Sequence, residues 1–187
     1  MSIHITTPLT REKSAVLKAG DTVYLSGVIY TARDAAHKRL MTLLNSGEAL
    51  PVDLKDQILY YCGPTPAAPG RAIGSAGPTT SSRMDRYAPT LIRQKGLMGM
   101  IGKGNRSPEV IEAMKEQGAV YFAATGGAGA LISTCIRKSE VVCYEDLGAE
   151  AIYRLEVENF PLTVAIDALG ENMYQKGPRE CREQFDI

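Results

Sequence analysis

The first part of the chain alternates between short apolar runs and a stretch whose apolar residues have helical spacing. After a short β-prone piece at 3–6, residues 22–30 are rich in β-branched and aromatic side chains and predict a strand. The next stretch carries an apolar stripe and predicts a helix that ends before Gly47. His37 and Lys38 are expected on the solvated face of this helix.

The alternation continues along the rest of the chain. Ser107 and Pro108 suit the start of a helix and Gly118 suits its end, so the flanking strands are expected to form a parallel βαβ unit. A polar tail begins at Gln175. Further strands are expected at residues 57–62, 97–102, 119–124, 140–144, 153–157 and 162–167. The pattern predicts an α/β fold, and a length of 187 residues with 44% hydrophobic residues suits a single domain over residues 1–187.

Residues 74–85 combine small residues with four consecutive hydroxyls. They follow a segment, 63–70, in which three prolines exclude helix and interior strand. Ser82 and Asp85 have the spacing of a capping box, which would place Arg83 in the first turn of a helix. Free backbone N–H groups and a guanidinium at that position suit a carboxylate or phosphate, although an ordinary capped loop would have the same composition.

Two further cations are expected where strands end. Thr31 and Asp34 again have capping-box spacing, so Arg33 is expected in the first turn of the helix after the first strand. Lys103 follows the strand at 97–102, at the edge where ligands bind in α/β folds, although a solvated lysine would occupy the same position. Two arginines, a lysine and a group of hydroxyls suit a small ligand with two carboxylates.

Composition excludes several classes of partner. Lys and Arg total 21, as do Asp and Glu, so the chain lacks the basic field with which proteins attract nucleic acid. No apolar run approaches the roughly 20 residues of a membrane span. The first residues lack the basic and apolar parts of a signal peptide, so a reducing, cytoplasmic location is expected.

The residues that could bind a metal are few and badly spaced. The cysteines are Cys62, Cys135, Cys143 and Cys181, and the histidines are His4 and His37. No Cys-x-x-Cys occurs, so no metal or cluster is expected to be held by this chain alone.

A glycine-rich segment at 126–130 follows a predicted strand, as in dinucleotide-binding proteins. It departs from the Gly-x-Gly-x-x-Gly pattern at the last glycine, where Ile132 stands. A close backbone approach or a tight helix start is the preferred interpretation.

Together these residues resemble the C-terminal domain of class I, iron–sulfur fumarate hydratases. That domain also occurs as a separate β subunit in two-subunit fumarases and in the related L-tartrate dehydratase. The resemblance covers roughly residues 3–178. It is carried by Gly77-Pro78-Thr79-Thr80, Arg83-Met84-Asp85, Lys103-Gly104-Asn105 and Arg33-Asp34.

The resemblance implies a swivelling β/β/α fold, with a mixed sheet and flanking helices, and a mechanism. A partner α subunit would carry three cysteines that hold a 4Fe-4S cluster, and the two subunits together would interconvert fumarate and L-malate. Arg33 and Arg83 would bind carboxylates. Lys103 would add positive charge to the aci-carboxylate intermediate, and Thr79 is the proposed base, which requires nearby cations because a hydroxyl is a weak base.

Three further points stay open at this stage. A heterotetramer with the α subunit and self-association of the isolated chain are both compatible with the resemblance. The substrate could be tartrate instead of fumarate, which would make the chain a tartrate dehydratase β subunit. A chain that had lost its partner would be a non-catalytic dicarboxylate-binding module.

Overall fold

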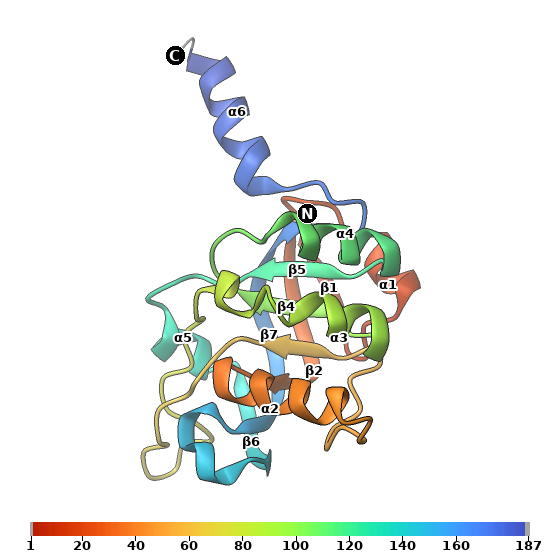
Figure 1. Cartoon of the computed structure of the whole chain (residues 1–187). Coiled ribbons are helices and arrows are strands. Elements are labelled where there is room, and N and C mark those ends of the chain that lie inside the picture. The colour runs from red at the N-terminus through yellow and green to blue at the C-terminus, as the bar shows by residue number, and fades with distance from the viewer. Residues whose placement is uncertain (1, 186–187) are drawn as a thin grey trace.

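The computed structural model describes residues 2–185 and is built around a seven-stranded mixed sheet (Figure 1). The strands are β1 (Ile3–Thr6), β2 (Thr22–Thr31), β3 (Ile58–Tyr60), β4 (Gly99–Gly102), β5 (Val120–Ala123), β6 (Ile136–Cys143) and β7 (Ile152–Ile166). Their order is β1-β2-β3-β4-β5-β7-β6, and β2 also pairs with β7, which closes β2, β3, β4, β5 and β7 into a ring. Neighbours from β1 to β5 are parallel, whereas β7 is antiparallel to β2, β5 and β6.

Helices cover one face of this sheet and its ends. The α-helices are α1 (Arg11–Ala15), α2 (Asp34–Asn45), α3 (Ala88–Lys95), α4 (Pro108–Gln117), α5 (Gly129–Ser133) and α6 (Met173–Phe185). Two 3-10 helices are η1 (Ser81–Met84) and η2 (Glu145–Glu150). In Figure 1, α2, α3 and α4 lie side by side in front of the strands, and α6 projects away from the rest of the fold. No helix within residues 2–185 is both long and apolar enough to cross a lipid bilayer.

The hydrophobic core has two parts, one on each side of the strands. Inside the ring, Ile29 and Leu155 pack with Tyr60 and Phe160, whose rings meet edge to face at 5.4 Å. Such a ring pair is worth about 0.5–1.5 kcal/mol beyond its buried area. The second part packs the outer side of the strands against α2, α3 and α4. All three residues of β3 are therefore buried, as is usual for a parallel strand covered on both faces.

The expected α/β fold, a swivelling β/β/α domain with a mixed sheet and flanking helices, is confirmed. The βαβ unit is also confirmed, because β4 and β5 are parallel and α4 lies between Ser107 and Gly118. The two last strands expected at 153–157 and 162–167 are instead one continuous strand, β7. The polar tail expected from Gln175 lies within α6.

Continuity of β7 has a local cause at the residues between the two expected strands. Asn159 adopts a left-handed conformation with φ of 51°, and its N–H donates to Ser26 Oγ at 2.9 Å. The register against β2 shifts between Leu25 and Gly27, so an irregularity in the ladder absorbs these residues without ending the strand.

Candidate active site

Three parallel strands end at one edge of the sheet, which we call the carboxyl edge. Arg33 follows β2, Gly63 follows β3 and Lys103 follows β4. Because β2, β3 and β4 are parallel neighbours, the segments that leave them lie close together.

Thr79 and Lys103 meet at this carboxyl edge through their backbones. Pro78 pairs with Cys62 beyond β3, and the Thr79 N–H donates to the Tyr61 carbonyl at 2.7 Å. The Lys103 N–H donates to the Thr79 carbonyl at 3.3 Å, and the Lys103 carbonyl accepts the Ser81 N–H at 2.9 Å. Residues 78–81 thus extend the sheet between the ends of β3 and β4, with Thr79 half-buried and Lys103 exposed.

A glycine makes the close approach of this segment to β4 feasible. A Cβ at Gly102 would lie 1.9 Å from Ser81 Oγ and 3.1 Å from Tyr61 Cδ2. Ser81 Oγ is in turn 2.8 Å from the Tyr121 hydroxyl. Only a residue without a side chain therefore fits at position 102 while Ser81 keeps this contact.

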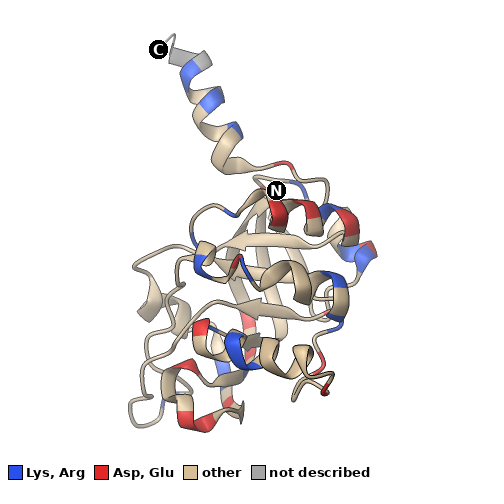
Figure 2. Ribbon diagram, in the orientation of Figure 1, with Lys and Arg blue, Asp and Glu red and all other residues tan. Residues whose placement is uncertain are grey.

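Arg33 lies across the backbone that follows β3. A Cβ at Gly63 would be 2.6 Å from Arg33 Nη1, so the guanidinium rests on the glycine. Arg33 Nη2 lies 3.6 Å from Glu150 Oε1, while the buried Nε has no hydrogen-bond partner. Acidic residues gather on η2, which contacts α2 (Figure 2). The hydrogen-bond donors of Arg33 are thus only partly satisfied by the groups around it.

Arg83 reaches the same place from η1. Its Nη2 lies 2.8 Å from Asp34 Oδ2, and its Nε donates to Asp34 Oδ1 at 3.1 Å. Asp34 follows Arg33 directly, so the ion pair brings the two arginines to the start of α2. The side chain of Arg83 is half exposed, which leaves the guanidinium accessible to a ligand.

Both expected capping boxes are wrong. Thr31 is buried in β2, where its hydroxyl accepts the Tyr153 N–H at 3.1 Å, and Arg33 itself is the N-cap of α2. Asp85 does not cap its own helix; its Oδ2 accepts the N–H of Ser107, the N-cap residue of α4, at 2.7 Å. The capping-box spacing is present in the sequence, but these side chains form hydrogen bonds with residues far along the chain instead.

A buried ion pair supports the carboxyl edge from behind. Arg106 Nε donates to Asp85 Oδ1 at 2.7 Å, and the arginine side chain has no exposed surface. Its guanidinium lies over the rings of Tyr61 and Tyr121, at 5.2 and 5.0 Å from their centroids. Because Asp85 follows η1 and Arg106 follows the Lys103 loop, the pair joins the two segments that carry Arg83 and Lys103.

His37 is also part of this support, and its expected place on a solvated face is wrong. It is fully buried, stacked on Tyr87 and edge-on to Tyr61 with both ring centroids at 5.5 Å, whereas Lys38 is exposed. Nδ1 lies 2.8 Å from the Arg33 carbonyl, which can only accept, so Nδ1 carries the proton. Burial lowers the pKa of His37 to about 4. The imidazole is therefore neutral and fixes the backbone of Arg33.

The four residues selected from the sequence, Arg33, Thr79, Arg83 and Lys103, thus all lie at the carboxyl edge. Sequence reasoning missed Glu150, because nothing local links it to a residue more than a hundred positions earlier. In the sequence analysis Asp34 appeared only as part of a motif. The signal available for its role was the opposite charge directly beside Arg33.

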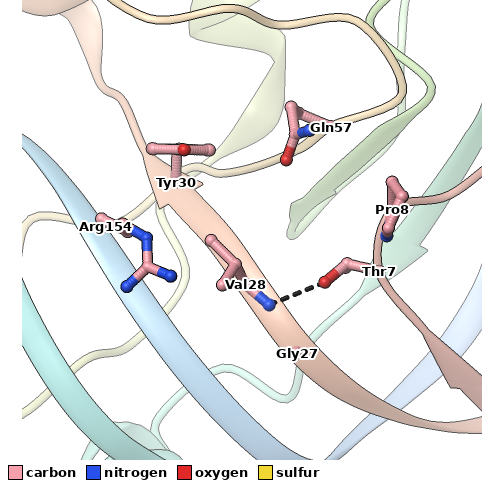
Figure 3. Close-up of a pocket in the computed structure, with 7 residues that line it drawn as sticks. All are labelled: Thr7, Pro8, Gly27, Val28, Tyr30, Gln57 and Arg154. Atoms are coloured by element: carbon pink, nitrogen blue, oxygen red, sulfur yellow. Dashed lines mark hydrogen bonds between the residues drawn. The ribbon is translucent and has the colours of Figure 1, made fainter.

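Two cavities lie elsewhere on the molecule. One cavity of about 390 Å³ lies beside β2, between the part of this strand that pairs with β1 and the part that pairs with β3. Arg154, Tyr30 and Gln57 border it (Figure 3). Arg154 is already paired with Glu156 at 2.7 Å. Another of about 350 Å³ lies between the 64–73 loop and β6. None of the four selected residues lines either cavity.

The side chains of the described residues can also be tested for their fit to a metal centre. Within the part of the chain that the structure describes, no group of three or more His, Cys, Asp or Glu side chains is placed to hold a metal ion. Cys62 is buried beside Tyr60, and burial raises the pKa of its thiol to about 12, which disfavours a thiolate ligand. These residues do not fit an iron–sulfur cluster.

The glycine-rich segment 126–130 has a structural place. It leads into α5, and the Ala76 N–H donates to the Gly129 carbonyl at 3.1 Å. Small residues therefore allow the backbone before Thr79 to approach α5, as the preferred interpretation expected.

Comparison with known proteins identifies the family of this chain. Residues 1–177 match the family described as fumarase C-terminus. The aerobic class I fumarate hydratase of Escherichia coli K12 is 42% identical over 153 residues, which is 81% of this chain and 28% of that protein. A putative class I fumarate hydratase of Geobacillus stearothermophilus is 37% identical over 98% of this chain and 35% of its own length.

A relative of similar size exists as well. The putative L(+)-tartrate dehydratase subunit beta of Methanocaldococcus jannaschii is 38% identical over 183 residues, which is 95% of this chain and 94% of that protein. The chain thus spans about a quarter to a third of the fumarate hydratases named above and nearly all of this subunit. With a family match over almost its whole length and this relative, the chain belongs to the fumarase C-terminus family.

Proposed function

We propose that this chain is the β subunit of a two-subunit, 4Fe-4S-dependent hydro-lyase that interconverts fumarate and L-malate. The observation that carries the proposal is the placement of Arg33, Arg83, Lys103 and Thr79 at the carboxyl edge of a fumarase C-terminus domain. In this proposal a partner α subunit holds the cluster, which supplies Lewis-acid chemistry when bound.

Binding of the dicarboxylate would fall to the two arginines. The Nε of Arg33 is buried without a hydrogen-bond partner, and the carboxylate of Glu150 lies 3.6 Å from its Nη2. Hydrogen-bond donors of this guanidinium therefore remain available to a ligand. Arg83 is held by Asp34 in an exposed pair, which is worth about 1 kcal/mol or less and is readily exchanged for a ligand carboxylate. A guanidinium can hold a carboxylate with two parallel hydrogen bonds, which fixes its orientation.

Proton transfer and charge stabilisation would fall to Thr79 and Lys103. No carboxylate among the described residues lies within ion-pair distance of Lys103, so its charge is available to a developing dianion. The backbone pairing keeps the lysine beside Thr79. A threonine hydroxyl can act as a base only where positive charge stabilises its alkoxide, which is the reason the two must be neighbours.

The test is co-expression of this chain with an α subunit that carries three cluster cysteines. Malate formation from fumarate is measured anaerobically by chromatography, with tartrate in parallel. The chain purified alone is expected to contain no stoichiometric iron and to show no turnover. An assembled enzyme that converts none of these substrates would refute the hydro-lyase, and dicarboxylate binding without turnover would support a binding module.

Lys103→Ala tests the role of the lysine in the assembled enzyme. Loss of one charged hydrogen bond in a dry site costs about 3 kcal/mol, so kcat should fall roughly a hundredfold and more than KM rises. Lys138→Ala is the control, because Lys138 is an exposed lysine on β6 whose pair with Glu140 lies at the surface. A kcat for Lys103→Ala within about a factor of two of wild type would make Lys103 an ordinary surface lysine.

The M. jannaschii relative favours a second candidate. It matches this chain over nearly its full length and is named a tartrate dehydratase subunit, so an L-tartrate dehydratase β subunit is the alternative. The ratio of kcat/KM for tartrate and malate in the same preparation decides between them.

A further inference from the structure

The C-terminal part of the chain returns to the carboxyl edge after β7. The buried carboxylate of Asp167 accepts the N–H groups of Leu169 and Glu171 at 2.9 and 3.0 Å, which folds residues 167–171 into a tight turn. Asn172 then pairs with Ile166 as an isolated antiparallel bridge. This turn fixes the position of the residues that follow it.

Two side chains after the turn contact the loop of Lys103. Asn172 Nδ2 donates to Asn105 Oδ1 at 2.9 Å, and the Tyr174 hydroxyl accepts the Gly104 N–H at 3.1 Å. The two contacts are linked, because the Tyr174 N–H donates to Asn172 Oδ1 at 2.9 Å. We call Asn172 and Tyr174 together the C-terminal clasp.

Gly104 is the residue that the clasp holds most directly. Its φ is +82°, and its carbonyl accepts the Tyr121 hydroxyl at 2.8 Å while its N–H is bound by Tyr174. Both polar groups of its backbone are therefore held by tyrosine hydroxyls, one from the core and one from the C-terminal segment. Lys103 lies directly before it and is fixed on its other side by Thr79 and Ser81.

We propose that Asn172 and Tyr174 are positioning residues, which hold the backbone of the Lys103 loop so that the lysine keeps its place next to the Thr79 backbone at the carboxyl edge. The inference rests on the proposed function for its catalytic meaning. Neither side chain needs to touch the substrate; each acts through the loop. The helix α6, which leaves the fold from this point (Figure 1), begins inside the clasp at Met173.

Tyr174→Phe is the main test, because it removes one oxygen from a residue that is 37% exposed and should leave the fold intact. Amide hydrogen exchange of the full chain is the first measurement. The Gly104 amide should exchange at least about tenfold faster, because its acceptor is gone and local opening becomes easier, while amides of β4 and β5 keep their rates. Tyr24→Phe is the matched control, since this tyrosine lies on β2 stacked on His4.

Steady-state kinetics of the assembled enzyme is the second measurement. Tyr174→Phe should lower kcat about tenfold with KM changed less than about twofold, because the arginines that bind substrate are untouched while the lysine is less well placed. Asn172→Asp is a second variant that keeps the Oδ1 acceptor and removes the Nδ2 donor. It should loosen Asn105 and lower kcat in the same direction.

The outcomes separate the two proposals. Unchanged exchange at Gly104 in Tyr174→Phe overturns the clasp, whatever the activity. Faster exchange with an unchanged kcat overturns its positioning role. If the wild-type assembly has no hydro-lyase activity, the proposed function fails, and the exchange measurement alone then decides whether the clasp holds this loop.

Discussion

The buried pair of Asp85 and Arg106 gives the sharpest test of how the carboxyl edge is built. Asp85→Asn keeps the size of the side chain but removes its charge. The carboxylate accepts hydrogen bonds from Arg106 Nε and from the Ser107 N–H, both at 2.7 Å. After the substitution a guanidinium with no exposed surface would lack its counter-charge.

The magnitude follows from burial. The side chain of Asp85 is 12% exposed and that of Arg106 is 0% exposed, so water cannot replace the lost partner. Removing one member of such a pair costs about 3–5 kcal/mol, whereas replacing both by apolar groups is often nearly neutral. Asp85→Asn should therefore lower the free energy of unfolding by this amount, and Asp85→Asn with Arg106→Met should recover part of it.

Urea unfolding of the isolated chain measures the effect. With a slope of about 2 kcal/mol per molar urea, the midpoint should fall by about 2 M. Glu116→Gln is the control, because its pair with Arg93 is about 40% exposed on both sides, and it should cost less than about 1 kcal/mol. A loss below about 1 kcal/mol for Asp85→Asn, or a double variant no more stable than the single one, would refute the reasoning.

Three other predictions concern the same region. His37 has a pKa of about 4 when folded and 6.5 when unfolded, so the unfolded state binds a proton first as pH falls. The free energy of unfolding should therefore drop by about 3 kcal/mol between pH 6.5 and 4. His37→Phe should flatten this pH profile, and an unchanged slope in the variant would contradict the prediction. Gly102→Ala should lower the free energy of unfolding in urea by at least about 2 kcal/mol, because its Cβ would lie 1.9 Å from Ser81 Oγ. The control Gly177→Ala, whose Cβ would have nothing within 4 Å, should not lower it. Equal effects of the two substitutions would rule out the close approach at Gly102. In the assembled enzyme, Arg33→Lys keeps the charge but loses the two-pronged grip, so KM should rise at least about tenfold while Arg93→Lys leaves it unchanged; an unaltered KM would remove Arg33 from substrate binding.

The strand and helix pattern could be predicted because it depends on local periodicity. The parallel unit around α4 is an example, since Ser107, Pro108 and Gly118 mark its ends in the sequence itself. The continuity of β7 could not, because the residues between 157 and 162 are held in the strand by their pairing with β2, which lies far away in the sequence. Closure of the ring likewise depends on pairing between residues far apart in the chain.

The candidate site shows the same division. The placement of Arg33, Arg83 and Lys103 at the carboxyl edge was predictable because each follows a strand or lies in a recognisable motif. The partners of such residues were not: Asp85 looked like a local cap, yet Arg106 holds it, and His37 looked solvated, yet Tyr87 covers it. Charge pairing and ring stacking across the fold depend on three-dimensional neighbours, which spacing along the chain does not report.

The closure of the ring by β7 also sets an order of events during synthesis. Thr22 to Tyr30 of β2 pair with residues 154–163 of β7, so one side of β2 stays without a partner until most of the chain has left the ribosome. Contacts of such long sequence separation form slowly, and an unpaired strand edge is prone to join another chain. A nascent chain that stalls before residue 152 would therefore leave this side of β2 unpaired and open to association with another chain.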